Sequence, residues 1–467
     1  MRLFETRPGD DGLPGPERAL AVLALVTGTL MAVVDTTMIN LALPTIAADL
    51  NVSASRAVWI TNLFQVVCAA FLLVFAGISE LITRRRLYLF GLATFVAAAL
   101  GAALSRNLET LLVFRAFQGL GAAATLSIGP SLYRAIFPSR LLGSALGLSA
   151  LVVAGGYAAG PTLSGVILSF ADWPWLFALN VPLGLCSLWL AKRALPQDEP
   201  RKGSFDVVGA LLSIVMLASF FIAMDAVSHA APIWQSGGWA LLAVLACSGF
   251  IARQRRAPYP LLPLSVFAEP RFTLAVSASG LAFIGQALTF VALSFFYQEQ
   301  MGFSPLETAW LFTPWPLAIM FVGPIAGRLA DRINPSILSS TGLGLLIVGL
   351  IALALVDEST GVAGSLWRTA LCGIGFGLFQ PPNNREMMGS LPPERSANVS
   401  GVMSTTRTVG QSFGVALVGA ALALGWPVQV TLWLGAATTL LALLASIARM
   451  PLAKRALHAR RASSAGQ

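Results

Sequence analysis

Long apolar stretches separated by short polar or basic links dominate the chain from residue 19 to residue 448. Each stretch approaches or exceeds the roughly 20 apolar residues that a membrane-spanning helix needs. A helix satisfies its own backbone hydrogen bonds in lipid, and the ten-residue alternation typical of a transmembrane β-barrel does not occur. The pattern predicts fourteen spans, at 19–43, 57–79, 86–104, 109–133, 141–169, 174–194, 206–226, 234–252, 272–297, 307–327, 336–356, 362–382, 397–420 and 427–448.

Composition supports this interpretation, because 56% of the 467 residues are hydrophobic and only 11% are charged. A soluble domain has about 25% charged residues, so a soluble enzyme, a disordered chain and a secreted disulfide scaffold are excluded. The net charge of +9 arises from basic residues that gather in alternate links, such as 84–86 and 253–256. This asymmetry predicts a multi-pass protein of the plasma (inner) membrane with both termini in the cytoplasm. It also accounts for the charge without a nucleic-acid partner.

Glycines recur with the same spacing in two halves of the chain. A shift of 254 residues superposes Gly119 on Gly373, Gly121 on Gly375, Gly147 on Gly401, Gly156 on Gly410, Gly160 on Gly414 and Gly165 on Gly419. Parallel repeats of this kind are a transporter architecture. The predicted organisation is a cytoplasmic tail (1–18), a six-helix bundle (19–194), a linker with spans 7 and 8 (195–260), a second six-helix bundle (261–448) and a basic cytoplasmic tail (449–467).

Charged residues within the predicted spans are candidates for function. A carboxylate at the depth of Asp35 costs about 2.5–3.5 kcal/mol on insertion scales, so this residue must face a cavity or a partner. Asp35 is either an acid that binds a proton or a cation, or a protonated acid in a helix-packing hydrogen bond. Arg115 cannot readily be neutralised and needs an acceptor; Asp35 is the obvious candidate, although the sequence does not place the two in contact. The roles of Arg368 and Arg407 stay open.

Four segments have recognisable signatures. They are Asp35–Pro44 in the first span, Arg115–Ala123 in the fourth, Gly147, Gly156, Gly160 and Pro161 in the fifth, and Trp173–Gly184 at the entry to the sixth. Together they resemble the major facilitator superfamily, specifically its fourteen-span drug:proton antiporter branch. The resemblance implies an all-α membrane fold with two six-helix bundles and two additional helices between them. It also implies that Arg115 has a role in proton coupling, in addition to the proton-binding role considered above for Asp35.

Gating residues are predicted at two loops and in the fifth span. The resemblance assigns the loops after spans 2 and 10 to cytoplasmic gates, which include Glu80, Arg84, Arg85, Asp331 and Arg332. Glu80 stands where the family usually has Asp, and the usual glycines of the first loop are lost or shifted, which puts its charge network in doubt. In the fifth span, Gly147, Gly156 and Gly160 allow close helix approach, and Pro161 allows bending. Ordinary close packing is the alternative explanation.

A central substrate site between the bundles is a further implication of the fold. The residues predicted to line it are polar or aromatic, and each could instead serve packing: Asn62, Gln65, Gln286, Phe290, Phe295, Gln298, Phe379, Gln380 and Gln411.

The resulting functional hypothesis is a proton-coupled secondary transporter that exports amphipathic, cationic drugs or toxic compounds by alternating access. ATP is not the energy source, because a P-loop needs Gly-Lys and none of Lys192, Lys202 and Lys454 follows a glycine. We expect no enzyme activity, no cofactor and no metal; the partners are protons, a small-molecule substrate and the lipid bilayer, and a monomer is compatible with the sequence. The alternatives are a dedicated exporter or importer of one metabolite and, more remotely, a membrane sensor on a transporter scaffold.

Overall fold

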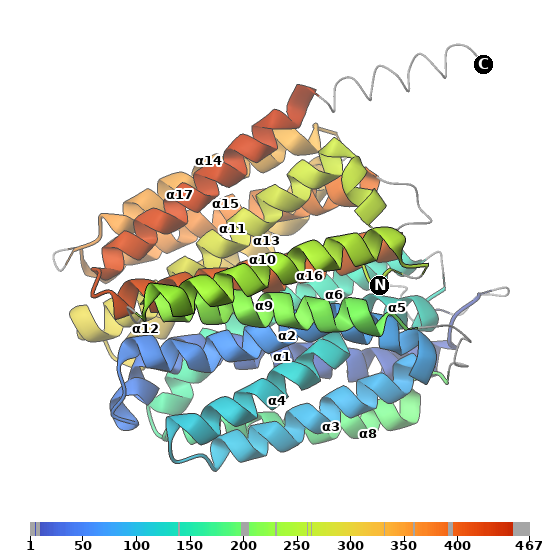
Figure 1. Ribbon diagram of the computed structural model, residues 1–467, viewed down its shortest axis with the longest axis horizontal. Coiled ribbons are helices and arrows are strands. Elements are labelled where there is room, and N and C mark those ends of the chain that lie inside the picture. Colours follow the sequence, from blue (N-terminus) through green and yellow to red (C-terminus); the bar gives the residue numbers. More distant parts are fainter. Residues whose placement is uncertain are drawn as a thin grey trace. The chain divides into compact units, whose positions relative to one another are not determined.

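The computed structural model describes residue 5 and residues 10–138, 141–197, 205–228, 231–258, 260–262, 264–330, 332–357, 360–390 and 396–451. This part of the chain contains helices and no strand (Figure 1). Thirteen of its helices are long and apolar enough to cross a membrane. The predicted span 397–420 forms the 28-residue helix α16 (Ser396–Ala423), which is not among these thirteen because Arg407 and several hydroxyl side chains lower its hydropathy. The predicted all-α membrane fold is confirmed.

The helices follow one another along the whole described chain. The first repeat and the two additional helices comprise α1 (Gly15–Asp49), α2 (Ala54–Ile82), α3 (Arg84–Ala103), α4 (Leu108–Leu126), α5 (Gly129–Ile136), α6 (Leu142–Leu168), α7 (Pro174–Ala178), α8 (Asn180–Ala194), α9 (Val207–Ser228) and α10 (Ile233–Arg256). The second repeat comprises the 3₁₀ turn η2 (Leu264–Ala268), α11 (Pro270–Phe295), the π-helical turn η3 (Phe296–Gln300), α12 (Pro305–Phe312), α13 (Pro314–Leu329), α14 (Pro335–Ala354), α15 (Gly361–Gly389), α16 and α17 (Val428–Ala448).

Local sequence explains where several helices begin and break. Asn107 caps α4 by accepting a hydrogen bond from the N–H of Thr110, and Ser304 and Glu307 form a reciprocal capping box at α12. The fourth predicted span is divided into α4 and α5, and Pro130 lies in the first turn of α5, where its missing N–H has no cost. Pro314 starts α13 in the same way. A hydropathy run therefore locates a span but not a break inside it.

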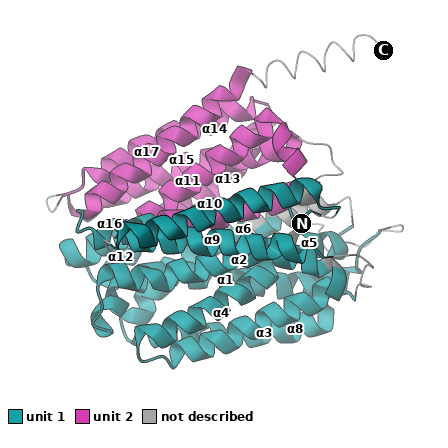
Figure 2. Ribbon diagram, in the orientation of Figure 1, with its two compact units in different colours: residues 1–262, 293–310, 415–426 teal, residues 263–292, 311–414, 427–467 magenta. Residues whose placement is uncertain are grey.

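Unit 1, coloured teal in Figure 2, contains residues 1–262, 293–310 and 415–426. Within it α1 packs against α6 and α8, and α4 packs against α2 and α3. Helix α1 starts at Gly15, before the predicted start of the first span, and the side chain of Arg18 is fully buried. Arg18 donates a 2.8 Å hydrogen bond from Nη2 to the Leu13 carbonyl, so residues ahead of the predicted span are ordered against it.

Unit 2 contains residues 263–292, 311–414 and 427–467, and its helix α14 lies beside α15 and α17 (Figures 1 and 2). Two arginines, of which Arg449 is fully buried, bind polar side chains of α15 and α17. Arg271 pairs with Glu386 at 2.5 Å, and Arg449 donates to Asn383 at 2.5 Å and to Ser446 at 3.0 Å. Burial lowers the pKa of Arg449 to about 10, with Glu386 opposing and Arg271 adding to the effect. Arg449 is therefore still a buried cation at neutral pH.

The glycine spacing shared by the two halves corresponds to a shared packing pattern. A Cβ on Gly121 would lie 2.6 Å from the carbonyl oxygen of Gly91 on α3, and one on Gly375 would lie 2.8 Å from that of Gly342 on α14. Gly119 likewise abuts the α2 backbone, as Gly373 abuts the backbone of α13 at Trp315. Removal of side chains at these crossings allows the backbones to approach closely. Equivalent helix pairs thus meet at equivalent glycines in both repeats.

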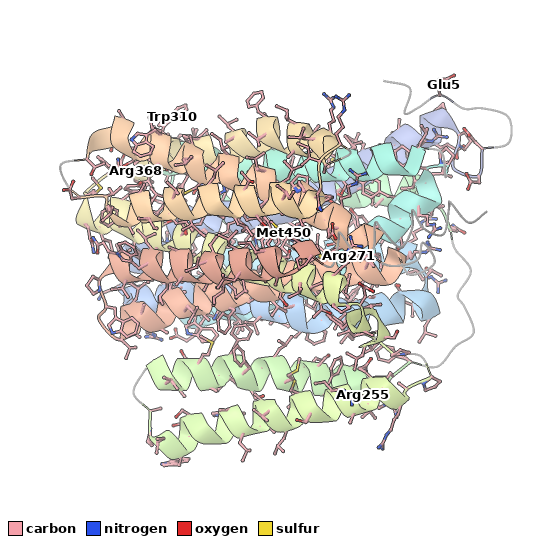
Figure 3. The ribbon with its side chains drawn as sticks, turned by 90° about the horizontal axis from the view of Figure 1, so that it is seen from above. Glu5, Arg255, Arg271, Trp310, Arg368 and Met450 are labelled. Atoms are coloured by element: carbon pink, nitrogen blue, oxygen red, sulfur yellow. The ribbon has the colours of Figure 1, made fainter. Side chains whose placement is uncertain are left out.

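The two additional helices form a hairpin in which α9 and α10 lie side by side (Figure 3). At one end Asp206 accepts hydrogen bonds from Arg253 Nε at 2.8 Å and from Gln254 Nε2 at 3.1 Å. Arg255, on the same turn of α10, projects away from the hairpin (Figure 3). Burial alone would raise the pKa of Asp206, but hydrogen bonds from Arg253, the Gly209 N–H and Gln254, together with the Arg253 charge, lower it below 3.8.

Asp206→Asn is expected to destabilise the hairpin in a pH-dependent way. A depressed pKa in the folded state contributes stability that is present above the unfolded pKa and is lost as pH falls through the folded pKa. Because the Arg253 side chain is 41% exposed, we expect a loss of about 1 kcal/mol or less at pH 7. Thermal unfolding in detergent should show a gap between the two proteins that closes as the pH falls below 3.8. A gap that stays constant down to pH about 3 would contradict the ionic contribution.

Candidate functional site

A buried ion pair joins α1 to α4 in unit 1. Arg115 Nη1 lies 2.6 Å from Asp35 Oδ2, and both side chains are fully buried. The guanidinium carbon of Arg115 also lies 4.4 Å from the ring centroid of Phe64 and 5.7 Å from that of Phe177. The contact that the sequence left open is therefore present. The pair has no net charge, which makes its burial possible.

Two amide side chains and one carbonyl complete this network. Asp35 Oδ1 accepts a 2.8 Å hydrogen bond from Asn180 Nδ2 on α8 and a 3.4 Å one from Gln118 Nε2. Arg115 Nη1 donates to Gln118 Oε1 at 2.9 Å, and Arg115 Nε donates to the Ile60 carbonyl on α2 at 2.9 Å. Residues three apart share a helix face, which explains why Arg115 and Gln118 reach the same acid. Helices α1, α4 and α8 thus meet at one carboxylate, and α2 binds the arginine that pairs with it.

Sequence reasoning did not assign Gln118 and Asn180, although both belong to the signature segments. The available signal was an amide in an otherwise apolar span. Such a side chain needs hydrogen-bond partners when it lies in lipid. Asp35, a buried acid in the first of these segments, needs hydrogen-bond donors for the same reason. The amide side chains within the signature segments were therefore candidates for partners of Asp35.

The two charges of this pair contribute to the packing of the helices that carry them. Protonation of Asp35 removes the negative charge and leaves Arg115 with its neutral acceptors, Gln118 and the Ile60 carbonyl. Loss of one partner of a buried pair costs about 3–5 kcal/mol. The charge of Asp35 therefore contributes to how tightly α1, α4 and α8 are held together.

Four predicted substrate residues lie in unit 1. Asn62 and Gln65 are buried on α2, and neither side-chain carbonyl oxygen has a hydrogen-bond partner among the described residues. Phe295 is fully buried at the end of α11. Gln298, in the π-helical turn, donates to the Leu41 carbonyl of α1 at 2.7 Å and also contacts Thr45.

The other predicted substrate residues belong to unit 2. Phe290 stacks on Phe312 at 5.3 Å and packs against Trp315 at 5.0 Å. Phe379 is fully buried and packs edge-on against Phe376. Gln286 is buried, whereas Gln380 and Gln411 are half-buried. These contacts are compatible with packing roles, and the central site stays a prediction.

The predicted gating residues fall into three groups. Arg84 Nη1 donates to the Ser131 carbonyl at 3.2 Å, and Arg85 donates to the Lys192 carbonyl, so both tie the start of α3 to neighbouring segments. Arg332 is exposed, and Asp331 lies outside the described residues. Glu80 belongs to α2 and Gly147 to α6, but their surroundings lie outside the described part of the structure.

The remaining gating residues lie along α6, which packs on α1. A Cβ on Gly156 would lie 2.8 Å from Val33 Cγ1, and one on Gly160 would overlap the side chain of Thr37. Pro161 follows inside the helix. Helix α6 therefore meets α1 within one or two turns of Asp35.

Three contacts inside unit 1 join helices of the first repeat to helices of the second. Gln298 of the π-helical turn binds α1, as described above. A Cβ on Gly165 of α6 would lie 2.7 Å from Ala309 Cβ of α12, and one on Gly419 of α16 would lie 3.3 Å from Val58 Cγ1 of α2. Gly165 and Gly419 are equivalent in the repeat, so each repeat contacts the other through the same position.

A sequence model of the Major Facilitator Superfamily matches residues 25–415, which is well over half of the chain. The chain belongs to the Major Facilitator Superfamily. Membership in this superfamily makes the protein a multi-pass membrane transporter and not an enzyme. The buried network described above therefore lies in a transporter.

Relatives within the superfamily carry different names. The uncharacterized transporter YebQ of Escherichia coli (strain K12) is 40% identical over 410 residues, covering 87% of this chain and 90% of that protein. The riboflavin transporter RibZ of Clostridioides difficile (strain 630) is 26% identical over 407 residues (86% and 87%), and the multidrug efflux pump LfrA of Mycolicibacterium smegmatis is 30% identical over 405 residues (86% and 80%). A POT family transporter, solved in complex with a thioalcohol conjugated peptide, shares the fold with a TM-score of 0.70 over 94% of this chain and 96% of that chain, at 15% identity.

Proposed function

We propose that this protein is a proton-coupled antiporter of the fourteen-span drug:proton branch, which exports amphipathic, cationic compounds by alternating access. The observation that carries the proposal is the buried Asp35–Arg115 pair, held at 2.6 Å with Gln118 and Asn180 on the same carboxylate. A buried acid whose ionisation changes the packing of three helices is a suitable coupling group. The similarity to LfrA, which is named a multidrug efflux pump, supports the choice of substrate class.

In this proposal the proton and the substrate compete for one state of Asp35. With Asp35 ionised, Arg115 is held on α1 and a cationic substrate benefits from the nearby negative charge. With Asp35 protonated, the attraction between α1 and α4 weakens and the substrate loses that charge. Alternating access further requires the contacts of Gln298, Gly165 and Gly419 within unit 1 to separate during the cycle. The glycines allow this because close-packed backbone contacts part without withdrawing long side chains.

The experiment that tests this function is efflux from cells loaded with cationic, neutral and anionic dyes, with and without a protonophore. We expect export of the cationic dyes, and we expect the protonophore to abolish it. Export that continues after the proton gradient has collapsed would exclude proton antiport.

A dedicated carrier of one metabolite is the second candidate function. The observation that favours it is the similarity to RibZ, which is named a riboflavin transporter. The same dye panel separates the two candidates, since a dedicated carrier leaves most dyes inside the cell regardless of their charge.

We further propose that the chain lies in the plasma (inner) membrane with both termini in the cytoplasm, because basic residues gather in alternate links. A reporter fused after residue 200 or at the carboxyl terminus is expected to report cytoplasm. A reporter inserted near residue 230, between α9 and α10, is expected to report the opposite side. An outer-side signal from the carboxyl-terminal fusion would refute the even number of spans.

A further inference from the structure

A small cleft lies within unit 1 where α2, α9 and the last turns of α16 meet. Its lining includes Trp59 and Asn62 from α2, Phe221 and Asp225 from α9, and Gly419 from α16. The space within it is about 10 Å³, close to the room that one water-sized group needs. The side chains of Asp35, Arg115, Gln118 and Asn180 are not part of this lining. The cleft is therefore separate from the proton-coupling network proposed above.

The polar groups of the cleft are suited to a positive charge. Asp225 places a carboxylate within the apolar helix α9, and its Oδ1 accepts a 2.8 Å hydrogen bond from Trp59 Nε1. The Asn62 side chain is 3% exposed, and its Oδ1 has no hydrogen-bond partner among the described residues. An unpaired buried acceptor is unfavourable, and a bound donor would satisfy it. Among the described residues that line the cleft there is no lysine, arginine or histidine.

The apolar part of the lining supports the same chemistry. Trp59 and Phe221 are aromatic, and the faces of aromatic rings attract cations. Gly419 lets α16 lie close to α2 at the cleft, since a Cβ at this position would contact Val58. The space matches an –NH₃⁺ group, which is about the size of a water molecule.

We propose that this cleft is a binding site for the protonated primary amine of an organic cation, whose ammonium group is held by Asp225 and Asn62 beside the aromatic side chains. The additional helix α9 supplies the carboxylate. The hairpin of α9 and α10 would therefore take part in ligand binding. The site does not depend on proton coupling at Asp35, and it is tested by binding instead of transport.

The test is ¹⁹F NMR of the full-length protein in detergent, labelled with 5-fluorotryptophan, with Trp59→Phe used to assign one of the 11 tryptophan signals. The probe is ethylammonium, which is protonated at pH 8, since alkyl amines resemble lysine with a pKa of about 10.4. The same pH keeps a histidine of ordinary pKa neutral, which matters because His229 follows Asp225 by four residues. We expect a saturable shift of the Trp59 signal with a Kd of about 1–10 mM, weak because only one small group is held.

Matched variants decide the outcome. Asp225→Asn keeps an oxygen for Trp59 but loses the charge, and we expect at least about tenfold weaker binding, the equivalent of 1.4 kcal/mol. Asn62→Leu should weaken binding about 2- to 10-fold through the lost hydrogen bond. Asp206→Asn, which makes the same exchange at an acid just before the start of α9, should leave the Kd unchanged.

The inference is overturned by any of three results: a shift that does not saturate, an equal shift with ethanol or with NaCl at matched ionic strength, or an unchanged Kd in Asp225→Asn. If Asp225→Asn does not fold, Asn62→Leu is the substitute test. An unchanged Kd in Asn62→Leu then overturns the inference.

Discussion

Asp35→Asn is expected to abolish proton-coupled export while the protein still inserts and folds. Asn is close to Asp in size and keeps an oxygen that can accept from Arg115 or Asn180, but it cannot ionise. Arg115 then lies buried without an anion, which costs stability by up to about 3–5 kcal/mol, partly offset by its hydrogen bonds to Gln118 and Ile60. Asp35→Glu should retain part of the export, because the carboxylate survives with a changed reach.

The measurement is dye efflux from cells with matched protein levels, together with substrate-induced proton release from the purified protein. The double variant Asp35→Asn with Arg115→Gln removes the unpaired charge and should recover stability without recovering proton release. Asp206→Asn is the matched control, since it makes the same exchange at an acid outside the network and should transport normally. If Asp35→Asn exports cations at the original rate and releases the original number of protons, Asp35 is structural and the coupling acid lies elsewhere.

Gly160→Leu is expected to eliminate transport, whereas Gly155→Leu should have little effect. A Cβ at position 160 overlaps the Thr37 side chain and lies 3.3 Å from the Val34 carbonyl oxygen, whereas a Cβ at position 155 meets nothing within 4 Å. Both changes exchange glycine for leucine in the same helix, so the intrinsic helix preference changes equally. Overpacking costs about 1–3 kcal/mol, and at Gly160 it pushes α6 away from α1 near Asp35. Gly160→Ala should be intermediate.

Transport assays at matched protein levels, with thermal unfolding of each variant, test this comparison. Equal transport by the Gly160→Leu and Gly155→Leu proteins would show that the contact between α1 and α6 has no role in the cycle.

The sequence predicted the spans and the two charged residues of the network, but not the network itself. Apolar runs determine where helices cross a membrane, because lipid imposes the same requirement on every span. Partners are determined by helix packing, which depends on contacts between residues far apart in sequence, such as Asp35 and Asn180. The break between α4 and α5 was missed for a similar reason: Pro130 signals a new helix start, but the hydropathy continues across it.

Asn62 shows a further limit of prediction. A buried amide on a membrane helix suggested a substrate site, and its helix face could not be specified without knowing which helix packs there. The structure places Asn62 beside α9, a helix that lies outside both predicted repeats. The additional hairpin has no counterpart in the repeat, so the internal symmetry gave no information about its neighbours.

The second repeat lacks the charges of the network. By the shift of 254, Arg115 corresponds to Thr369, whose hydroxyl donates to the carbonyl of Ser365 on its own helix. Gly414 approaches the Ile284 carbonyl as Gly160 approaches that of Val34, so the next residue, Gly285, stands where Asp35 stands in the first repeat. In the proposed cycle, exchange of one proton at Asp35 for one monovalent cation then moves no net charge. The pH difference alone drives such an exchange, and the membrane voltage has no effect on it. A neutral substrate is different, since one charge crosses and each 100 mV contributes about 2.3 kcal/mol.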